Sequence, residues 1–497
     1  MTWALVAACV IASVPAGLRW LRVAQREHYL PPSVSRFAIR WWGYGWANRI
    51  LTVAAVVGVV GTMWSPWVGF LVPLAQVGPI GLRLKGRTSP IAWTSRLKRV
   101  ALVVGVLMIL IYLGGGLTGS VFLVALGLFL MPAVVDLALV VLAPVEARLG
   151  NRWVEKASGK LKASGARVVA ITGSFGKTTT KAYLAHLVDG SLRTVASPAS
   201  FNNRMGLARA INEQLVPGTE LFIAEMGTYG PGEIAEMCSW ISPDVAAIVA
   251  IGPVHLERFR TEERIVEAKA EILDRASGGV IAVDHPLLRH LATQRSTDLD
   301  IITVSATGQQ ARVVVNRGRL VVDGREVGSV PAGTFEINLA VAVGIGLALG
   351  LDPEELTQRL ADLPRPDHRQ TLGVSEVGFS IIDDTYNSNP AGARAALDLL
   401  QREGSGGRKV VVTPGMVELG PLQTQENLAF AARAANIADV LVIVGATNRA
   451  ALLEGSEKGG ASVTVVASRE EAVDWVKKSL GPGDTVLYEN DLPDHYP

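Results

Sequence analysis

The stretch Arg167-Val-Val-Ala-Ile-Thr-Gly-Ser-Phe-Gly-Lys-Thr-Thr-Thr-Lys181 decides the fold of this 497-residue chain. Its first six residues are mostly apolar or β-branched, which predicts a buried strand, and a glycine turn then leads into a segment with helical spacing. Backbone N–H groups of a glycine loop and of a helix N-terminus bind phosphate oxygens. A nucleotide and its Mg²⁺ are therefore expected here, bound by Gly173, Ser174, Gly176, Lys177, Thr178 and Thr179.

Within this loop, Lys177 is expected to neutralise the β- and γ-phosphates, and the Thr178 hydroxyl is expected to bind Mg²⁺. The standard P-loop has a glycine five residues before Gly176, where this chain has Ile171, so the match is to a shorter loop. A glycine turn that binds no nucleotide is the alternative. The order of strand, loop and helix favours the nucleotide site.

Strands and helices alternate on both sides of a proline-rich segment, Pro364-Arg-Pro366. Parallel sheets covered by helices on both faces are therefore expected, and residues 300–330 predict a β-hairpin insertion. The expected domains are 151–362, which carries the nucleotide loop, and 363–497, a second α/β domain. The predicted strands are 167–172, 221–224, 245–251, 279–283, 379–383, 409–413, 440–444 and 463–466.

Residues 1–150 differ in composition from the rest. They contain 13 Lys and Arg but three Asp and Glu, a net charge of +10, whereas the remaining residues carry −8. Apolar runs free of charged residues cover 2–18, 50–82 and 100–135, and about 20 apolar residues cross a bilayer. With breaks near Ser65-Pro66 and Gly114-Gly115-Gly116, about five transmembrane or re-entrant helices are expected.

The Lys and Arg residues near these runs concentrate at 19–49, 83–99 and 148–162, which by the positive-inside tendency places these segments in the cytoplasm. A multi-pass membrane protein whose α/β domains face the cytoplasm is therefore expected. Its membrane region either anchors the chain or also binds substrate. The acidic α/β part has no basic cluster, which argues against nucleic acid as a partner, and the two cysteines exclude a disulfide framework.

Three residues with chemically useful side chains follow the predicted strands. Glu225 follows the strand 221–224, His255 lies in the loop after 245–251, and Lys269 lies fourteen residues later. An open α/β sheet binds its ligands at the carboxyl ends of its strands, and a carboxylate there suits a hard cation. Each residue also has an ordinary interpretation, as an exposed charge, a loop histidine or a solvated helix lysine.

Taken together, these segments resemble the Mur ligases of peptidoglycan synthesis, and among them those that add D-alanyl-D-alanine. The resemblance covers residues 160–485 and implies a central P-loop ATPase domain, a C-terminal Rossmann-like domain, and ATP and Mg²⁺ as cofactors. It implies an ATP-dependent ligase that forms an amide through an acyl phosphate. The motifs are TGSFGKTTTK at 172–181, SFNNRMGL at 200–207, EMG at 225–227, GPVHLERF at 252–259, EAKAEI at 267–272, FEINLA at 335–340 and DDTYNSNP at 383–390.

The resemblance also implies roles for individual residues. The implied catalytic residues are Lys177, His255 and Lys269, of which the last matches a lysine that is carbamylated in the family. The implied metal ligands are Thr178, Glu225, His255 and Lys269. The adenine and the rest of the nucleotide are implied to contact Asn338, Arg369 and Asp384, and the acceptor side is implied to be lined by Asn203, Asn387 and Asn389.

The chain departs from the family where a membrane region stands in place of the uridine-nucleotide domain. Residues 414–420 are less acidic than the family version, and residues 489–497 replace a basic Lys-Gly-Ser-Arg-like segment. The implied partners are a small amine, either an amino acid or a dipeptide, and a cell-envelope carboxylate precursor, lipid-linked or free. The implied location is the bacterial cytoplasmic membrane. The alternatives are a poly-γ-glutamate-type amino-acid polymer ligase and a non-catalytic nucleotide-binding membrane scaffold.

Overall fold

The structure, a computed structural model, describes residues 1–82, 84, 90–364, 371–385, 388–404 and 406–492. It divides into two compact units, one built on Met1–Leu149 and the other on Gly150–Asp491. The predicted site residues Arg369 and Asn387 lie outside the described residues.

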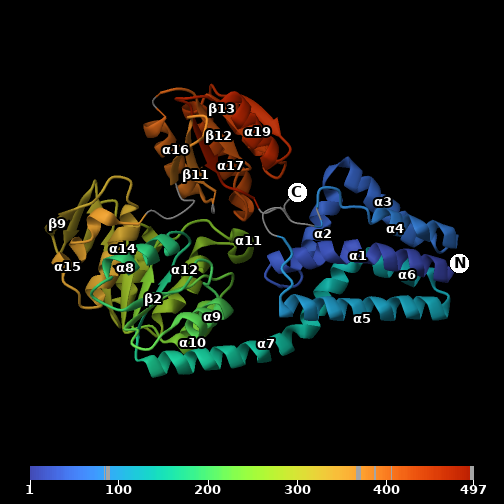
Figure 1. Ribbon diagram of the computed structural model, residues 1–497, viewed down its shortest axis with the longest axis horizontal. Coiled ribbons are helices and arrows are strands. Elements are labelled where there is room, and N and C mark those ends of the chain that lie inside the picture. Colours follow the sequence, from blue (N-terminus) through green and yellow to red (C-terminus); the bar gives the residue numbers. More distant parts are fainter. Residues whose placement is uncertain (83, 85–89, 365–370, 386–387, 405, 493–497) are drawn as a thin grey trace. The chain divides into compact units, whose positions relative to one another are not determined.

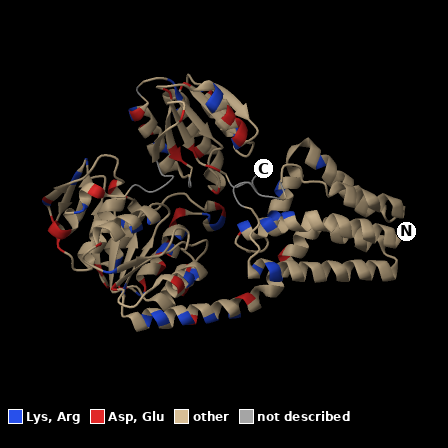
Figure 2. Ribbon diagram, viewed as in Figure 1, with Lys and Arg blue, Asp and Glu red and all other residues tan. Residues whose placement is uncertain are grey.

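The first unit is helical. Its elements are α1 (Thr2–Arg26), α2 (Ser33–Gly43), α3 (Gly45–Gly61), η1 (Pro66–Phe70), α4 (Leu71–Ala75), α5 (Ser95–Thr118), α6 (Val121–Phe129) and α7 (Met131–Ser164), which continues into the second unit. By length and composition, α1 and α5 could cross a membrane, and α2 with α3 and α6 with α7 could do so if each bent pair is one span. Figure 2 shows the long part of α5 that carries no charged residue.

Asp136 is a buried carboxylate in α7 that holds the start of α2. It accepts hydrogen bonds from the backbone N–H groups of Val34 (3.3 Å) and Ser35 (2.8 Å) and from the Ser35 hydroxyl (2.6 Å). The first N–H groups of a helix have no partner within the helix, so a carboxylate placed there stabilises it. This residue therefore joins two helices of the first unit.

The second unit contains two sheets. The larger has the strand order β2-β3-β1-β4-β5-β6-β7-β8-β9, and its neighbours are parallel up to β7. The predicted hairpin is present as antiparallel strands that extend this sheet. The strands are β1 (Arg167–Thr172), β2 (Thr194–Ala196), β3 (Leu221–Glu225), β4 (Val245–Ile248), β5 (Gly278–Ala282), β6 (Asp300–Ser305), β7 (Val313–Asn316), β8 (Arg319–Val322) and β9 (Arg325–Ser329).

Helices cover both faces of the larger sheet (Figure 1). They are α8 (Lys177–Leu187), α9 (Arg204–Gln214), α10 (Glu233–Ile241), α11 (Leu256–Phe259), α12 (Glu262–Ala270), η2 (Glu271–Leu273), α13 (Pro286–Arg295), α14 (Glu336–Ala348), α15 (Pro353–Thr357) and η3 (Leu360–Asp362). Strand side chains alternate between faces. Accordingly, Val168 and Ala170 of β1 pack in a core with α9, α10, α12 and α13, whereas Val169 and Ile171 pack in a second core with α8 and α14.

The smaller sheet belongs to the C-terminal part of the second unit. Its order is β10-β11-β15-β12-β13-β14, with β10 antiparallel to β11 and the other neighbours parallel. Residues of α16 and α17 pack on one face, and residues of α19 pack on the other. The elements are β10 (Thr371–Val374), β11 (Ser380–Asp384), α16 (Pro390–Glu403), β12 (Lys409–Thr413), η4 (Gly420–Leu422), α17 (Gln423–Ile437), β13 (Val440–Val444), α18 (Arg449–Ser456), β14 (Ser462–Val466), α19 (Arg469–Ser479) and β15 (Thr485–Glu489).

Candidate active site

The glycine loop connects β1 directly to α8. The Ser174 N–H donates to the carbonyl of Ala250 (2.7 Å), and the Gly252 N–H donates to the Ser174 hydroxyl (3.2 Å), so the loop is held against the segment after β4. Gly176 has a φ of +84°, and a Cβ there would lie 2.4 Å from Nδ2 of Asn338. Glycine is therefore required at this position for both conformation and space.

Lys177 lies across the loop and is the first residue of α8. Its ammonium donates to the carbonyl of Gly173 at 2.7 Å. Thr179 is buried in the same first turn. A lysine beside the N–H groups of a helix N-terminus is a combination that binds anions, so this geometry suits the phosphates predicted to lie here.

Glu225 is a buried carboxylate at the end of β3, 2% exposed. Its Oε2 accepts hydrogen bonds from the Lys181 ammonium (2.8 Å) and the Thr178 hydroxyl (3.1 Å), and its Oε1 accepts one from Nδ2 of Asn202 (3.3 Å). Burial raises the pKa of this carboxyl, but the charges of Lys181 and Lys177, with the hydrogen bonds from Lys181 and Asn202, bring the pKa below its ordinary value. Glu225 is therefore ionised at neutral pH.

Thr178 and Glu225 place two oxygen donors beside the loop. Mg²⁺ prefers oxygen ligands and is usually bound by one or two carboxylates together with waters and substrate phosphates. Among the residues that the structure describes, no group of three or more His, Cys, Asp or Glu could hold a metal ion. The donor set therefore fits a Mg²⁺ that phosphates help to bind.

Lys269 lies in the last turn of α12 and is 3% exposed. Burial first, and then the charge of Lys177, lower the pKa of its amine well below the ordinary value. Within the described part of the chain, no carboxylate pairs with it. Because a lowered pKa increases the neutral fraction of an amine, this nitrogen is more nucleophilic at neutral pH than that of an exposed lysine.

His255 precedes α11 in the left-handed conformation, with a φ of +55°. Its Nδ1 lies 2.5 Å from Oε2 of Glu418, which belongs to the loop before η4. The ring also contacts Tyr229 edge-on, with 5.1 Å between ring centroids. The C-terminal sheet region thus supplies a carboxylate to a histidine of the central region.

Three of the predicted asparagines, Asn338, Asn203 and Asn389, lie in the described residues, and each hydrogen-bonds to the backbone. Nδ2 of Asn338 donates to the carbonyl of Gly176 (2.8 Å) and to the Thr180 hydroxyl (2.9 Å), so this side chain braces the loop. Asn203 and Asn389 each accept a backbone N–H in the first turn of α9 and α16, respectively. These two residues therefore cap helices.

Asp384 is the last residue of β11, and its carbonyl accepts the N–H of Asn490. Sequence reasoning missed three residues that the structure brings to the site, namely Lys181, Asn202 and Glu418. Lys181 and Asn202 lie in the motifs at 172–181 and 200–207, and Glu418 lies in residues 414–420, so the sequence indicates these segments. The sequence did not indicate which polar side chains within them face Glu225 or His255.

Comparisons with known proteins identify the family. Residues 171–343 match the Mur ligase middle domain, and residues 368–488 match the Mur ligase glutamate ligase domain. The UDP-N-acetylmuramoyl-tripeptide--D-alanyl-D-alanine ligase of Mycobacterium leprae is 31% identical over 380 residues, which cover 66% of this chain and 72% of the relative. The Bacillus subtilis ligase of the same name is 28% identical over 351 residues, covering 67% and 75%.

The fold is also that of solved Mur ligases. MurF from Acinetobacter baumannii superposes with a TM-score of 0.61 at 23% identity, over 70% of this chain and 78% of that one. MurF from Thermotoga maritima in complex with ADP gives 0.57 at 24% identity, over 69% and 80%. The predicted central and C-terminal α/β domains are thereby confirmed.

The predicted location, a multi-pass protein of the bacterial cytoplasmic membrane with its α/β domains facing the cytoplasm, is wrong. The relatives named UDP-N-acetylmuramoyl-tripeptide--D-alanyl-D-alanine ligase are soluble cytoplasmic enzymes, and this finding overturns the prediction. Hydropathy and the distribution of Lys and Arg report only whether a helix has the length and composition to cross a bilayer. The structure likewise shows only that α1 and α5 have the length and composition to cross a membrane.

The predicted enzyme class is confirmed by these relatives, and ADP in one of the similar structures agrees with the predicted use of ATP. The two domain matches together with the M. leprae relative establish that the chain belongs to the Mur ligase family, as an ATP-dependent ligase that forms amide bonds in peptidoglycan synthesis.

Proposed function

We propose that the chain joins the amine of D-alanyl-D-alanine to a carboxylate of a muramoyl-tripeptide precursor. The relatives are named for these two substrates. The observation that carries the proposal is the contact of Thr178 with Glu225 beside the glycine loop, since it provides oxygen ligands for a cation next to the expected phosphates.

The reaction has two steps. An oxygen of the donor carboxylate takes the γ-phosphoryl group, the bond to the β-phosphate breaks, and ADP leaves. The amine then attacks the acyl carbon, loses a proton, and displaces phosphate as the C–N bond forms. Because phosphoryl transfer depends mainly on positioning and charge neutralisation, Lys177 is proposed to move from the Gly173 carbonyl onto the β- and γ-phosphates.

We propose two Mg²⁺ sites. Thr178 and Glu225 are proposed to hold the first ion, and His255 is proposed to hold a second. Glu418 engages Nδ1 of His255, which leaves Nε2 as the nitrogen that would face a metal. When bound, Mg²⁺ neutralises negative charge on the phosphates.

Lys269 is proposed to act as a carbamate. Its neutral nitrogen would add to CO₂, forming an N–C bond and releasing a proton, which changes the side chain from a potential cation to an anion with two oxygens. The low pKa of this amine supports the reaction, since only the unprotonated nitrogen is a nucleophile. A carboxylate-like group near Lys177 would also compensate that residue's charge.

The remaining assignments stay proposals. Asn338, Arg369 and Asp384 are assigned to the nucleotide, with Asn338 also bracing the loop. The acceptor side is assigned to Asn203, Asn387 and Asn389. The domain bounds 1–150, 151–362 and 363–497 and a lipid-linked form of the donor also stay predictions.

An ADP-release assay of the purified full-length chain tests this function. The donors are the soluble uridine nucleotide of the tripeptide and its lipid-linked counterpart, each offered with D-alanyl-D-alanine or single amino acids. We expect equal amounts of ADP and amide product, only when donor and dipeptide are both present. Repeated addition of one amino acid would indicate a polymer ligase, and no ADP with any pair would indicate a non-catalytic scaffold.

A further inference from the structure

Lys181 is a buried cation next to the proposed metal site. It follows Lys177 by four residues and Thr178 by three in α8, so the three side chains lie on one face of the helix. It is 6% exposed, and its ammonium lies 2.8 Å from Oε2 of Glu225 and 3.4 Å from the carbonyl of Pro198. Its charge therefore lies against the proposed Mg²⁺ ligand.

Lys181 and the Thr178 hydroxyl contact the same oxygen of Glu225. Thr178 and Glu225 are the proposed ligands of the first Mg²⁺, and the Glu225 oxygen that contacts Thr178 already has a positive partner without nucleotide. A free Mg²⁺ would have to bind close to that ammonium, and like charges repel. The phosphates of ATP bring negative charge that compensates both cations.

We propose that Lys181 is a positioning residue that holds the Glu225 carboxylate in place and keeps Mg²⁺ from binding before ATP. Mg²⁺ and ATP then bind together, and the site does not bind Mg²⁺ in the absence of the nucleotide. The proposal rests on the proposed function, specifically on the Mg²⁺ site of Thr178 and Glu225.

The alternative is that the ion pair between Lys181 and Glu225 only stabilises the fold. The two interpretations predict opposite changes in metal affinity when Lys181 is removed. If the pair only stabilises the fold, loss of Lys181 loosens Glu225 and weakens metal binding. If Lys181 competes with the metal, its loss strengthens metal binding to the nucleotide-free protein. A gain of affinity is a result that a structural defect does not produce.

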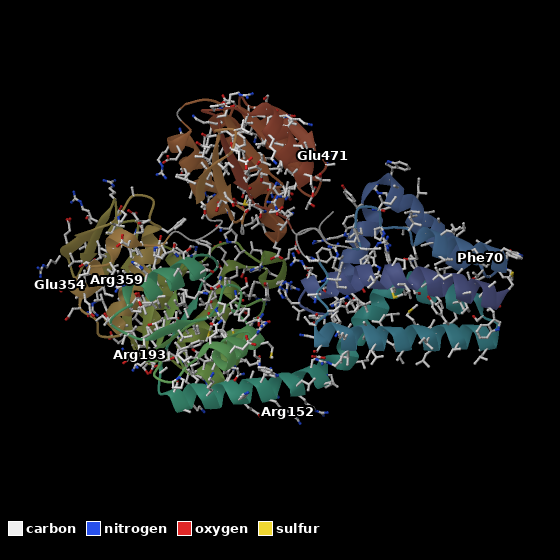
Figure 3. The ribbon with its side chains drawn as sticks, viewed as in Figure 1. Phe70, Arg152, Arg193, Glu354, Arg359 and Glu471 are labelled. Carbon is white, nitrogen blue, oxygen red and sulfur yellow. The ribbon has the colours of Figure 1, made fainter. Side chains whose placement is uncertain are left out.

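The test is a Mn²⁺ titration of the full-length chain, followed by the electron paramagnetic resonance signal of free Mn²⁺, with and without a non-hydrolysable ATP analogue. Lys181→Met is expected to bind Mn²⁺ about tenfold more tightly than the wild type without nucleotide, since a neighbouring like charge is removed. The matched control is Arg193→Met, which removes a cation from an exposed ion pair with Glu220 at 3.3 Å; Figure 3 labels Arg193. This control is expected to bind Mn²⁺ like the wild type.

Unchanged or weaker Mn²⁺ binding in folded Lys181→Met would overturn the proposal. If that variant does not fold, Lys181→Gln, which removes the charge but keeps a hydrogen-bond donor, is titrated instead and is expected to show the same gain over the wild type without nucleotide. Equal affinities of this variant and the wild type would overturn the proposal. Failure of the underlying metal site is distinguishable, because Glu225→Gln would then leave Mn²⁺ binding in the presence of the analogue unchanged.

Discussion

Glu225 and Lys269 are two buried ionisable residues influenced by the same lysine, Lys177. The surroundings favour the charged form of Glu225 but the neutral form of Lys269. Glu225 has a cation and two further hydrogen-bond donors around it, and its pKa is lowered so that it stays charged. Lys269 is buried without a paired carboxylate in the described residues, and its pKa is lowered so that it tends to lose its charge. The first residue is ready to bind a cation, whereas the second requires a chemical change at its nitrogen before it can supply oxygen ligands.

The largest expected effect comes from Lys177→Ala, because this charge acts on both residues and is proposed to bind the phosphates. We expect a loss of roughly 10³-fold in ligase turnover, the scale of removing a group that stabilises developing charge. The fold should be retained because Lys177 is only half-buried at the loop. Circular dichroism checks folding and ADP release checks activity, and normal turnover in the folded variant would contradict the phosphate assignment.

The next largest effect is expected for Lys269→Ala, which removes the proposed carbamate. Activity should fall by roughly 10²-fold, and added acetate should restore part of it by supplying a carboxylate in the vacated space. Lys156→Ala, which removes an exposed lysine of α7, is the control. An unchanged rate in Lys269→Ala would remove the carbamate from the mechanism.

The same residue predicts a dependence of stability on pH. Because the pKa of Lys269 is lower in the folded state, the unfolded state binds more protons between that pKa and 10.5, so this residue's contribution to stability rises with pH through this window. Without CO₂, Lys269→Met should therefore be more stable than the wild type at neutral pH. The difference should shrink toward pH 10.5, by at most about 1.4 kcal/mol per pH unit. Thermal melts of both proteins measure it, and a constant difference would show that Lys269 does not titrate this way.

The smallest effect is expected for Glu418→Gln, which keeps the side chain's shape but removes the negative charge at Nδ1 of His255. The Mg²⁺ concentration needed for half-maximal activity should rise by about tenfold, the scale of losing a group that orients a metal ligand. The activity at saturating Mg²⁺ should change less. If the Mg²⁺ requirement does not move, Glu418 has no role in orienting His255 toward a metal.

Much of the α/β fold could be predicted because its strands are short apolar runs that end in recognisable turns. The predicted strand 167–172 is β1 itself. The strand predicted over 245–251 ends at Ile248, since the carbonyl of Ala250 bonds to Ser174 of the glycine loop. Local pattern located the strand, and a contact with a distant segment determined where it ends.

The glycines of the first unit show the opposite outcome. Gly114-Gly115-Gly116 was predicted to break a helix, but α5 continues through these residues to Thr118 and ends before Gly119, whose φ is +71°. A Cβ at Gly115 would lie 2.5 Å from the Val124 side chain, and one at Gly116 would lie 2.7 Å from Trp3. These glycines permit close packing against α6 and α1, and a local pattern does not show which helices pack there.

The candidate site was predictable as a set of motifs but not as a set of contacts. The loop and Glu225 follow from strand and turn positions, which sequence shows directly. The approach of Lys181 to Glu225 depends on how α8 packs beside β3, and that of Glu418 to His255 depends on how the C-terminal region packs on α11. Similarly, Asn203 and Asn389 lie in motifs of the family, yet in the structure their side chains cap helices.

The proposed reaction passes through an acyl phosphate on the donor carboxylate. The direct test uses a tripeptide donor whose reacting carboxylate carries ¹⁸O at both oxygens, with ATP, Mg²⁺ and D-alanyl-D-alanine, and mass spectrometry of the phosphate released. We expect one labelled oxygen in phosphate for each amide formed, because the oxygen leaves with the phosphoryl group. Amide formation with unlabelled phosphate would contradict it.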